Sequence, residues 1–368
     1  MTVFFLQPLA FGGWLALIPE VKEALSLSKG QLALALMGVP IALVPGLQIA
    51  GYVIGEFGPR RVAMIFFPLQ AFAFLLPFAA WNTWTLFAAL FVVGLMMAFV
   101  EVAMNVYAGR LEKREGVLIM NRCHGFWALG LMVGSGVIVL ASAGYTPQVY
   151  LALVSAVAGA LSAYALRPMR GEGEERAPPR RKPSQLPTAL VLIAVFMFLV
   201  TLTEGVMADW AAVHMAERLG ESGSRAALAV TIFSALMATG RFLGDILKRR
   251  LGAVLHARAT VACAIVGLVV IVAPLPTDIT YFGFALVGFG VSAAYPLGVS
   301  AIAALDDRYE APNIAFAATV AMGGFLIGPP LIGFLSESYS LAVAVAALIP
   351  GMGLAFFLSR WLATESGR

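Results

Sequence analysis

Residues 51–61 read GYVIGEFGPRR, and residues 240–250 read GRFLGDILKRR. Both stretches follow the pattern G-x-x-x-G-acid and end in a pair of arginines, and each residue of the second copy lies 189 positions after its equivalent in the first. A weaker similarity links GLMVGSG (130–136) with GFLIGPPLIG (324–333), where the glycines are expected to permit close helix packing. The chain is therefore predicted to contain two halves of similar architecture.

Long apolar runs surround both copies. The chain is 61% hydrophobic and 12% charged, with a mean hydropathy of +0.90, whereas soluble domains carry about 25% charged residues. Many runs reach about 18 residues or more, which is long enough to cross a hydrocarbon core of about 30 Å as helix. No charged region with a cleavage site precedes the first run, so no removable signal peptide is expected. The predicted fold class is an all-α polytopic membrane protein.

Apolar runs alternate with charged or Pro- and Gly-rich breaks, and this alternation predicts twelve membrane-spanning helices. The expected spans are approximately 2–19, 32–55, 62–80, 84–109, 122–143, 147–168, 188–212, 224–247, 257–274, 279–304, 311–335 and 340–362. The longest break, RPMRGEGEERAPPRRKPSQLP (167–187), is too polar to bury a core. We therefore expect an N-terminal six-helix bundle (1–168), a linker (169–187) and a pseudo-symmetric C-terminal six-helix bundle (188–368). Fused repeats of this kind are typical of transporters.

Basic residues are distributed unevenly between the two sides that these spans define. Of the 24 lysines and arginines, 20 fall on the side of the linker, and only Lys22, Lys29, Arg218 and Arg225 fall on the other. Positive charge is retained in the cytoplasm, so the linker and both termini are predicted to be cytoplasmic, in a bacterial-type inner membrane. The basic surface then faces anionic lipid, and no nucleic-acid partner is expected.

The repeated stretch resembles a motif of the major facilitator superfamily. GYVIGEFGPRR is similar to the family's signature loop between its second and third helices, G-x-x-x-D-R-x-G-R-[KR], with Gly55 at the usual aspartate and Glu56 at the usual arginine. The resemblance covers the whole chain and implies the major facilitator fold. It also implies gating roles at the cytoplasmic helix ends for Glu56, Arg60 and Arg61, and for Asp245 in the second copy.

Four further stretches resemble the fucose-permease-like branch of that superfamily. They are EVAMNVYAGRLE (101–112), NRCHGFWALG (121–130), EGVMADWAAVHM (204–215) and GFGVSAAYPLGVS (288–300). Several members of this branch are proton-coupled sugar transporters, and a carboxylate equivalent to Glu101 is implicated there in proton coupling. The branch's aspartate in its first helix has no counterpart here, because Gln7 is the strongly polar residue of span 2–19.

Glu101 is the only ionisable side chain between Leu86 and Val106. A carboxylate near mid-membrane costs a few kcal/mol to insert, so such groups usually face a cavity or a partner and mark function. Removal from water favours the neutral acid, and a carboxyl that changes its protonation state as it is exposed to each side in turn can carry a proton. Asn105 lies one helical turn away on the same face and is expected to hydrogen-bond the acid or a ligand. The alternative is a purely structural bond between helices.

Other polar residues within the spans are candidates for the same cavity. Glu204 is a second intramembrane acid and a second candidate for proton coupling. Asp209, Trp210, Tyr295 and Gln7 are candidates for substrate binding. The alternative for Asp209 and Trp210 is that they mark the outer interface, where aromatic rings collect, and this alternative is favoured for Trp210.

Arg241 is expected at the cytoplasmic end of its span, where it serves as a gating partner for acids such as Asp245 or as a side chain that extends to the interface. Two cysteines and three scattered histidines (His124, His214, His256) give no metal-ligand spacing. His124 is expected to cap or pack at the start of its span. No metal and no cofactor other than the coupling proton is predicted.

These features predict a secondary active transporter that moves a small polar solute across the inner membrane by alternating access, coupled to proton symport. The alternative is a proton-driven exporter of drugs, lipids or metabolites. Exporters of the superfamily typically carry G-x-x-x-G-P in the fifth helix, where this chain reads GLMVGSG and places Pro329 and Pro330 in the span 311–335 instead. No H-E-x-x-H, G-x-S-x-G or phosphate-loop motif indicates an enzyme, and the short loops do not suit a receptor. The protein is expected to act as a monomer.

Overall fold

The computed structural model describes residues 1–116, 119–140, 146–167, 186–305 and 310–363. The first half contains α1 (Thr2–Leu6), α2 (Leu9–Ala24), α3 (Lys29–Leu36), α4 (Gly38–Phe57), α5 (Pro59–Ala73), the 3-10 turn η1 (Leu76–Ala79), α6 (Thr83–Glu115), α7 (Met120–Leu140) and α8 (Pro147–Ala165). The second half contains α9 (Thr188–Leu219), α10 (Ser224–Val272), α11 (Thr277–Val291), α12 (Ala294–Ala303), α13 (Glu310–Ser338), α14 (Leu341–Ala346), α15 (Leu348–Leu358) and the 3-10 turn η4 (Ser359–Leu362).

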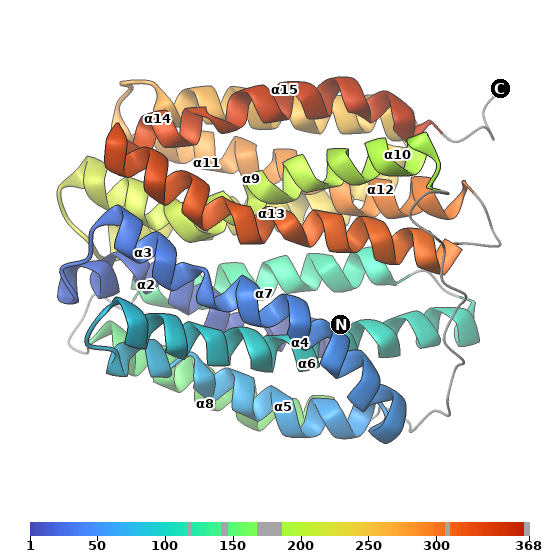
Figure 1. Ribbon diagram of the computed structural model, residues 1–368, viewed down its shortest axis with the longest axis horizontal. Helices are drawn as coiled ribbons and strands as arrows, with labels where there is room; N and C mark the ends of the chain where they lie inside the picture. The colour runs from blue at the N-terminus through green and yellow to red at the C-terminus, as the bar shows by residue number, and fades with distance from the viewer. Residues whose placement is uncertain (117–118, 141–145, 168–185, 306–309, 364–368) are drawn as a thin grey trace.

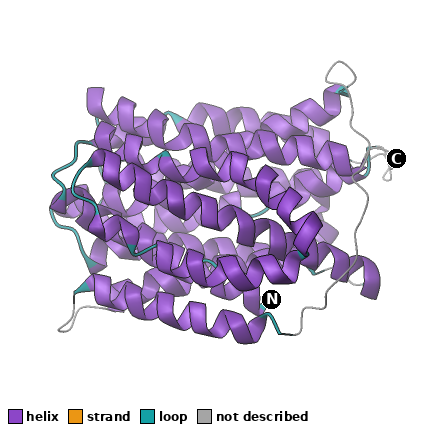
Figure 2. Cartoon of the chain, turned by 60° about the horizontal axis from the view of Figure 1, so that its bottom comes forward, coloured by secondary structure: helices purple, strands orange, loops and turns teal. Residues whose placement is uncertain are grey.

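The helices run along one common direction, and the helices of the two halves form two adjacent groups (Figure 1). The blue-to-green helices of the first half lie in the lower part of that view, and the lime-green-to-red helices of the second half lie above them. Loops connect the helices at the two ends of the bundle, and no strand occurs among the described residues (Figure 2). The all-α prediction is therefore confirmed.

Ten helical stretches among the described residues are long and apolar enough to cross a membrane. One of them, α10, contains two of the expected spans, which meet at Gly252 with φ 75° and ψ 163°. A further expected span corresponds to α5, which is only 15 residues long and continues as η1. The structure is thus consistent with twelve spans. The predicted linker lies outside the described residues except for Leu186 and Pro187, and the division into two bundles there remains a prediction.

Some expected boundaries differ from the observed ones because charged residues continue a helix beyond its apolar run. The span expected at 188–212 extends as α9 to Leu219. Arg218 in this extension donates hydrogen bonds to the carbonyl oxygens of Ile271 (3.4 Å), Ala273 (3.1 Å) and Leu275. These carbonyl partners allow a charged guanidinium to lie in the last turn of α9. A prediction based on apolar runs alone ends the helix earlier.

Glycine permits very close contact between α2 and α7. A Cβ atom added at Gly134 would lie 1.9 Å from the carbonyl oxygen of Leu9, so only glycine fits. In α13, a Cβ atom at Gly333 would lie 2.1 Å from Cβ of Ala33 on α3. The expected packing role of the glycines at 130–136 and 324–333 is confirmed at these positions.

The two halves also meet through polar contacts. We call the end of the bundle where α8 ends and α9 begins the linker end, and the opposite end the distal end. At the distal end, Lys29 Nζ lies 3.1 Å from Glu217 Oε1, and the backbone N–H of Gly30 donates to Glu337 Oε2 at 3.0 Å. Ser222 Oγ donates to Glu23 Oε2 at 2.7 Å. The distal ends of the halves are therefore joined in this conformation.

Candidate functional site

Glu101 and Asn105 form a hydrogen-bonded pair on α6. Asn105 Nδ2 donates to Glu101 Oε1 at 2.8 Å and to the carbonyl oxygen of Glu101 at 2.9 Å. The contact follows from their spacing, since residues four apart on a helix lie one above the other. Both side chains are half-buried rather than fully enclosed. The expected hydrogen bond between the amide and the acid is present.

Arg241 on α10 occupies the centre of the site. Its Nη2 donates to Glu204 Oε1 on α9 at 2.9 Å, and the two side chains are only 9% and 14% exposed. Its Nη1 donates to the carbonyl oxygen of His124 on α7 at 3.3 Å. Arg241 also interacts electrostatically with Glu101 on α6. One guanidinium thus connects both candidate proton-coupling acids, which belong to different halves.

A chain of polar side chains continues from Arg241 into the first half. The guanidinium carbon of Arg241 lies 5.8 Å from the ring centroid of Trp127 on α7, within the range of a cation–π contact. Trp127 Nε1 donates to Gln7 Oε1 at 2.7 Å. Gln7 Nε2 in turn donates to Gln70 Oε1 at 3.3 Å, and Gln70 Nε2 donates to the carbonyl oxygen of Gln7 at 3.2 Å.

Aromatic rings close the site on the side of His124. The His124 ring lies 5.6 Å from the ring of Phe4 and 6.3 Å from that of Tyr295 on α12. Tyr295 and Glu101 also interact electrostatically. His124 therefore packs at the start of its helix, as expected. We call the whole group the central polar cluster, which comprises Gln7, Gln70, Glu101, Asn105, His124, Trp127, Glu204, Arg241 and Tyr295.

Two predicted substrate-binding residues lie outside this cluster. Asp209 follows Glu204 by five residues on α9, which turns it about 140° around the helix axis. Trp210 is fully buried, and its Nε1 has no hydrogen-bond partner among the described residues. The packed core surrounds the Trp210 ring, so the structure does not place it at an interfacial belt.

The predicted gating residues have different surroundings. Asn121 Nδ2 on α7 donates to Asp245 Oδ1 on α10 at 2.5 Å, which joins the two halves near the linker end. Glu56 and Arg61 are exposed, and Arg60 is half-buried with its Nε unpartnered among the described residues.

Arg241 is paired with Glu204, whereas an acid such as Asp245 was the partner expected from the sequence. Asp245 lies one turn farther along α10, where its carboxylate accepts the amide of Asn121 instead. Asn121 and Trp127 were not among the predicted site residues. An uncharged side chain in an apolar span does not stand out as a candidate for a functional site. The available clue was that a buried indole N–H or amide requires a hydrogen-bond partner.

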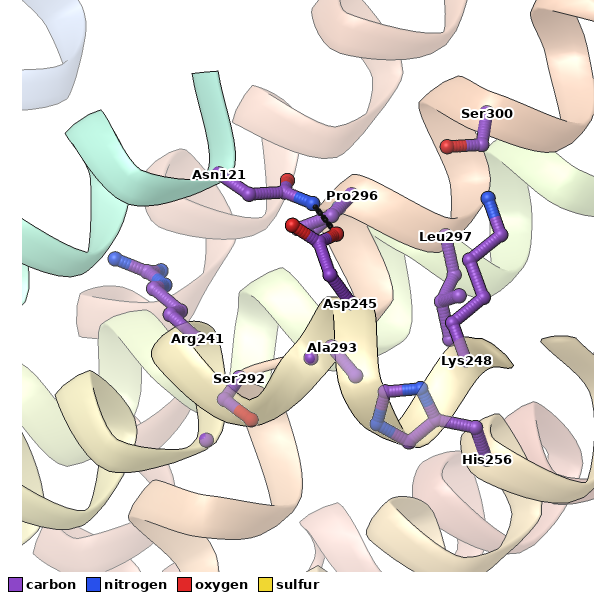
Figure 3. A pocket seen from close by; sticks show the side chains of 12 residues that line it. Asn121, Arg241, Asp245, Lys248, His256, Ser292, Ala293, Pro296, Leu297 and Ser300 are labelled. Carbon is purple, nitrogen blue, oxygen red and sulfur yellow. Dashed lines mark hydrogen bonds between the residues drawn. The ribbon is translucent and has the colours of Figure 1, made fainter. Parts of the chain in front are cut away.

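A recess opens beside Arg241 between α7, α10 and α12 (Figure 3). Its cavity volume is about 20 Å³, room for about one water molecule. The polar side chains that line it are Asn121, Arg241, Asp245, Lys248, His256, Ser292 and Ser300. No group of three His, Cys, Asp or Glu side chains suited to a metal ion occurs in the part of the chain that the structure describes.

Comparison with known proteins defines the family. A family model described as the Major Facilitator Superfamily matches residues 1–312. An uncharacterized MFS-type transporter of Yersinia pestis is 30% identical over 346 residues, which cover 93% of this chain and 89% of that protein. The chain therefore belongs to the major facilitator superfamily, and the predicted resemblance to this superfamily is confirmed.

Solved structures show the same fold at low sequence identity. A mutant of the nucleoside transporter NupG has a TM-score of 0.76 at 12% identity, with 98% of both chains covered. The E. coli fucose:proton symporter FucP has a TM-score of 0.65 at 15% identity, covering 98% of this chain and 97% of that one. At these identities, both comparisons show a shared fold.

Proposed function

We propose that the protein is a secondary active transporter that imports a small polar solute by alternating access, in symport with protons. The observation that carries this proposal is Glu101, a half-buried carboxyl within a membrane-spanning helix whose hydrogen-bond partner is an amide rather than a cation. An acid in such a setting is costly to keep and marks function in membrane helices. Membership of a superfamily of transporters supports the same conclusion.

The coupling step follows from the position of Glu101 between the two halves. Glu101 lies on α6 in the first half, whereas Arg241 and Tyr295, which interact with it electrostatically, lie on α10 and α12 in the second. A rocking motion of one half against the other changes these separations. The free-energy difference between the charged and neutral forms of Glu101 changes with them, so proton binding and conformation are linked.

Asn105 connects this acid with the solute. Its amide donates to the Glu101 carboxylate in the described conformation. A protonated Glu101 has an O–H donor of its own, so the amide of Asn105 becomes available to a solute when the proton is bound. Gln7 and Tyr295 are the other polar groups of the central polar cluster proposed to contact the solute. Asp209 and Trp210 remain proposed substrate-binding residues. Glu204 remains the second candidate for proton coupling.

The proposed orientation places the linker end in the cytoplasm and the distal end outside the inner membrane, in agreement with the 20 basic residues on the linker side. An impermeant thiol reagent applied to intact cells should label a cysteine at Thr146 and spare one at Ser184. The reverse pattern would invert the orientation.

The experiment that tests the function compares Glu101→Gln with the parent in proteoliposomes. Solutes found by thermal stabilisation of the purified protein serve as substrates. Because Gln imitates the neutral acid, the variant should bind and exchange solute but lose accumulation driven by an acidic exterior. Glu221→Gln, which removes an exposed carboxylate far from the cluster, is the matched control.

Accumulation by Glu101→Gln equal to that of the parent would show that Glu101 is structural, and Glu204 would become the next candidate. Solute efflux driven by the same gradient in the parent would favour the exporter alternative.

A further inference from the structure

The Arg241 guanidinium has more hydrogen-bond donors than its neighbours use. A guanidinium carries five N–H donors, and the described residues accept two of them, at Glu204 Oε1 and at the carbonyl oxygen of His124. The pair with Glu204 is made through one carboxylate oxygen only, whereas the strongest arginine–carboxylate pairs use two parallel bonds. Arg241 is thus a buried cation with unused donors.

A small recess near the linker end adjoins this cation. Arg241 lines the recess described above, together with two other basic side chains, Lys248 and His256 (Figure 3). Lys248 has no acidic partner among the described residues. His256 is 2% exposed, and neither of its ring nitrogens has a hydrogen-bond partner in the described part of the chain. Asp245 is the one acid of the recess lining, and it accepts the Asn121 amide.

Most amide groups of the central polar cluster already have hydrogen-bond partners. Both side-chain atoms of Gln7 are used, by Gln70 and by Trp127, and the Asn105 amide is bonded to Glu101. A neutral polyol would have to compete with these bonds, and an amine would have to approach a guanidinium that repels it. A carboxylate finds unused donors on Arg241, whose side chain is only 9% exposed, and can form a strong charge-assisted bond there.

We infer that the transported solute is a small organic anion, whose carboxylate binds the Arg241 guanidinium in place of Glu204. This inference rests on the proposed function and names its substrate class. The recess is too small for the anion in the described conformation, so it must widen as the halves move before the anion enters or leaves by the linker end, past Lys248 and His256. Glu204 acts as the internal competitor that holds Arg241 in the empty protein.

Anion binding is then linked to the protonation state of Glu101. The charged and titratable groups around Glu101 are Arg241 on α10, Tyr295 on α12 and, through Arg241, His124 on α7 and Glu204 on α9. Arg241 is the sole cation of the cluster. If both acids were ionised, the solute would be the third negative group around one positive group, so a neutral Glu101 favours its binding.

The test uses thermal stabilisation of the purified full-length protein by matched pairs of probes. The anion of each pair is gluconate or lactate, and its neutral analogue is glucose or lactamide, at equal ionic strength. The anions should stabilise the parent, and the neutral analogues should not. Glu204→Gln should bind the anions more tightly because the competitor has lost its charge, and Arg241→Gln should weaken binding about tenfold or more.

Two further variants make the outcome unambiguous. Arg241→Lys keeps the charge without the fork geometry and should bind the anions less well than the parent, which covers the case that Arg241→Gln does not fold. Arg225→Gln, an exposed arginine paired with Glu221 at 3.8 Å, should behave as the parent.

The inference would be overturned if glucose or lactamide stabilised the parent as strongly as the corresponding anions. It would also be overturned if no anion stabilised the parent, or if Glu204→Gln bound the anions with unchanged affinity. Proton-driven uptake of a neutral solute would overturn the inference alone. Anion binding without accumulation driven by a pH gradient would instead overturn the proposed function.

Discussion

The two copies of the repeated stretch have similar sequences but different surroundings. In the first copy, Gly51, Tyr52 and Glu56 are exposed, and Tyr52 is 73% accessible. In the second copy, Gly240 is buried, Arg241 holds the central polar cluster together and Asp245 bonds to α7. Arg241 occupies the position equivalent to Tyr52. The two copies therefore share a sequence pattern, whereas the neighbouring helices decide what each copy does.

The position of the turn also differs between the copies. Helices α4 and α5 meet at Gly58, with φ 79° and ψ 154°, and the two parts of α10 meet at Gly252, with φ 75° and ψ 163°. These are nearly the same conformation, in a region that favours glycine. Gly58 precedes its arginine pair, whereas Gly252 follows the pair. Arg61 thus lies in the first turn of a helix and Arg250 in the last turn before a break.

The largest expected difference between the copies concerns their first glycines. A Cβ atom at Gly240 would lie 2.1 Å from Ser292 Oγ and 2.7 Å from Ser292 Cβ, whereas one at Gly51 would meet nothing within 4 Å. Gly240→Ala should lower the free energy of unfolding by about 1–3 kcal/mol through overpacking. Gly51→Ala should raise it by about 0.5–1 kcal/mol, because alanine favours helix. Thermal unfolding in detergent measures both.

Gly244→Ala is the control for that pair, since its added Cβ would also meet nothing within 4 Å. Equal effects of Gly240→Ala and Gly51→Ala on the free energy of unfolding would contradict the expected difference in packing between the two glycines.

A smaller difference is expected at the acids. Asp245→Asn keeps an oxygen that accepts from Asn121 but removes the charge that strengthens this bond, so the free energy of unfolding should fall by about 1 kcal/mol. Glu56→Gln should change it by less than about 0.5 kcal/mol, since the side chain is exposed.

Spin-label distances between the halves add a test of gating for the same two variants. The gating role expected for both acids is to hold the linker ends of the two halves together, so neutralising either acid should separate these ends. An unchanged distance distribution in both variants would reject that role.

The third difference, of opposite sign in the two copies, is expected at the arginines. A cation near a helix N-terminus opposes the helix dipole, and one near a C-terminus complements it, by about 0.3–1 kcal/mol at low salt. Arg61→Gln should therefore raise the free energy of unfolding slightly, and Arg250→Gln should lower it. The two effects should shrink together as salt is added, and effects of the same sign would show that the dipole is not their cause.

Much of the fold could be predicted from sequence because apolar runs and charged breaks are local signals. The Glu101–Asn105 contact could be predicted for the same reason, since it depends only on spacing along one helix. The Arg241–Glu204 pair could not, because two helices bring it together and the sequence offered Asp245 as an equally charged partner. The contacts of Trp127 could not be predicted either, since they depend on how α7 faces Gln7 and Arg241.

The contact between Trp127 and Arg241 has a kinetic consequence. A hydrogen bond such as Asn121–Asp245 holds one distance and direction, so it must break before α7 and α10 separate at that point. The attraction of a guanidinium to a ring face extends to about 6 Å and has no single lone-pair direction. In the proposed rocking motion, Arg241 can therefore shift across the Trp127 ring, and this contact should add little to the activation barrier between conformations.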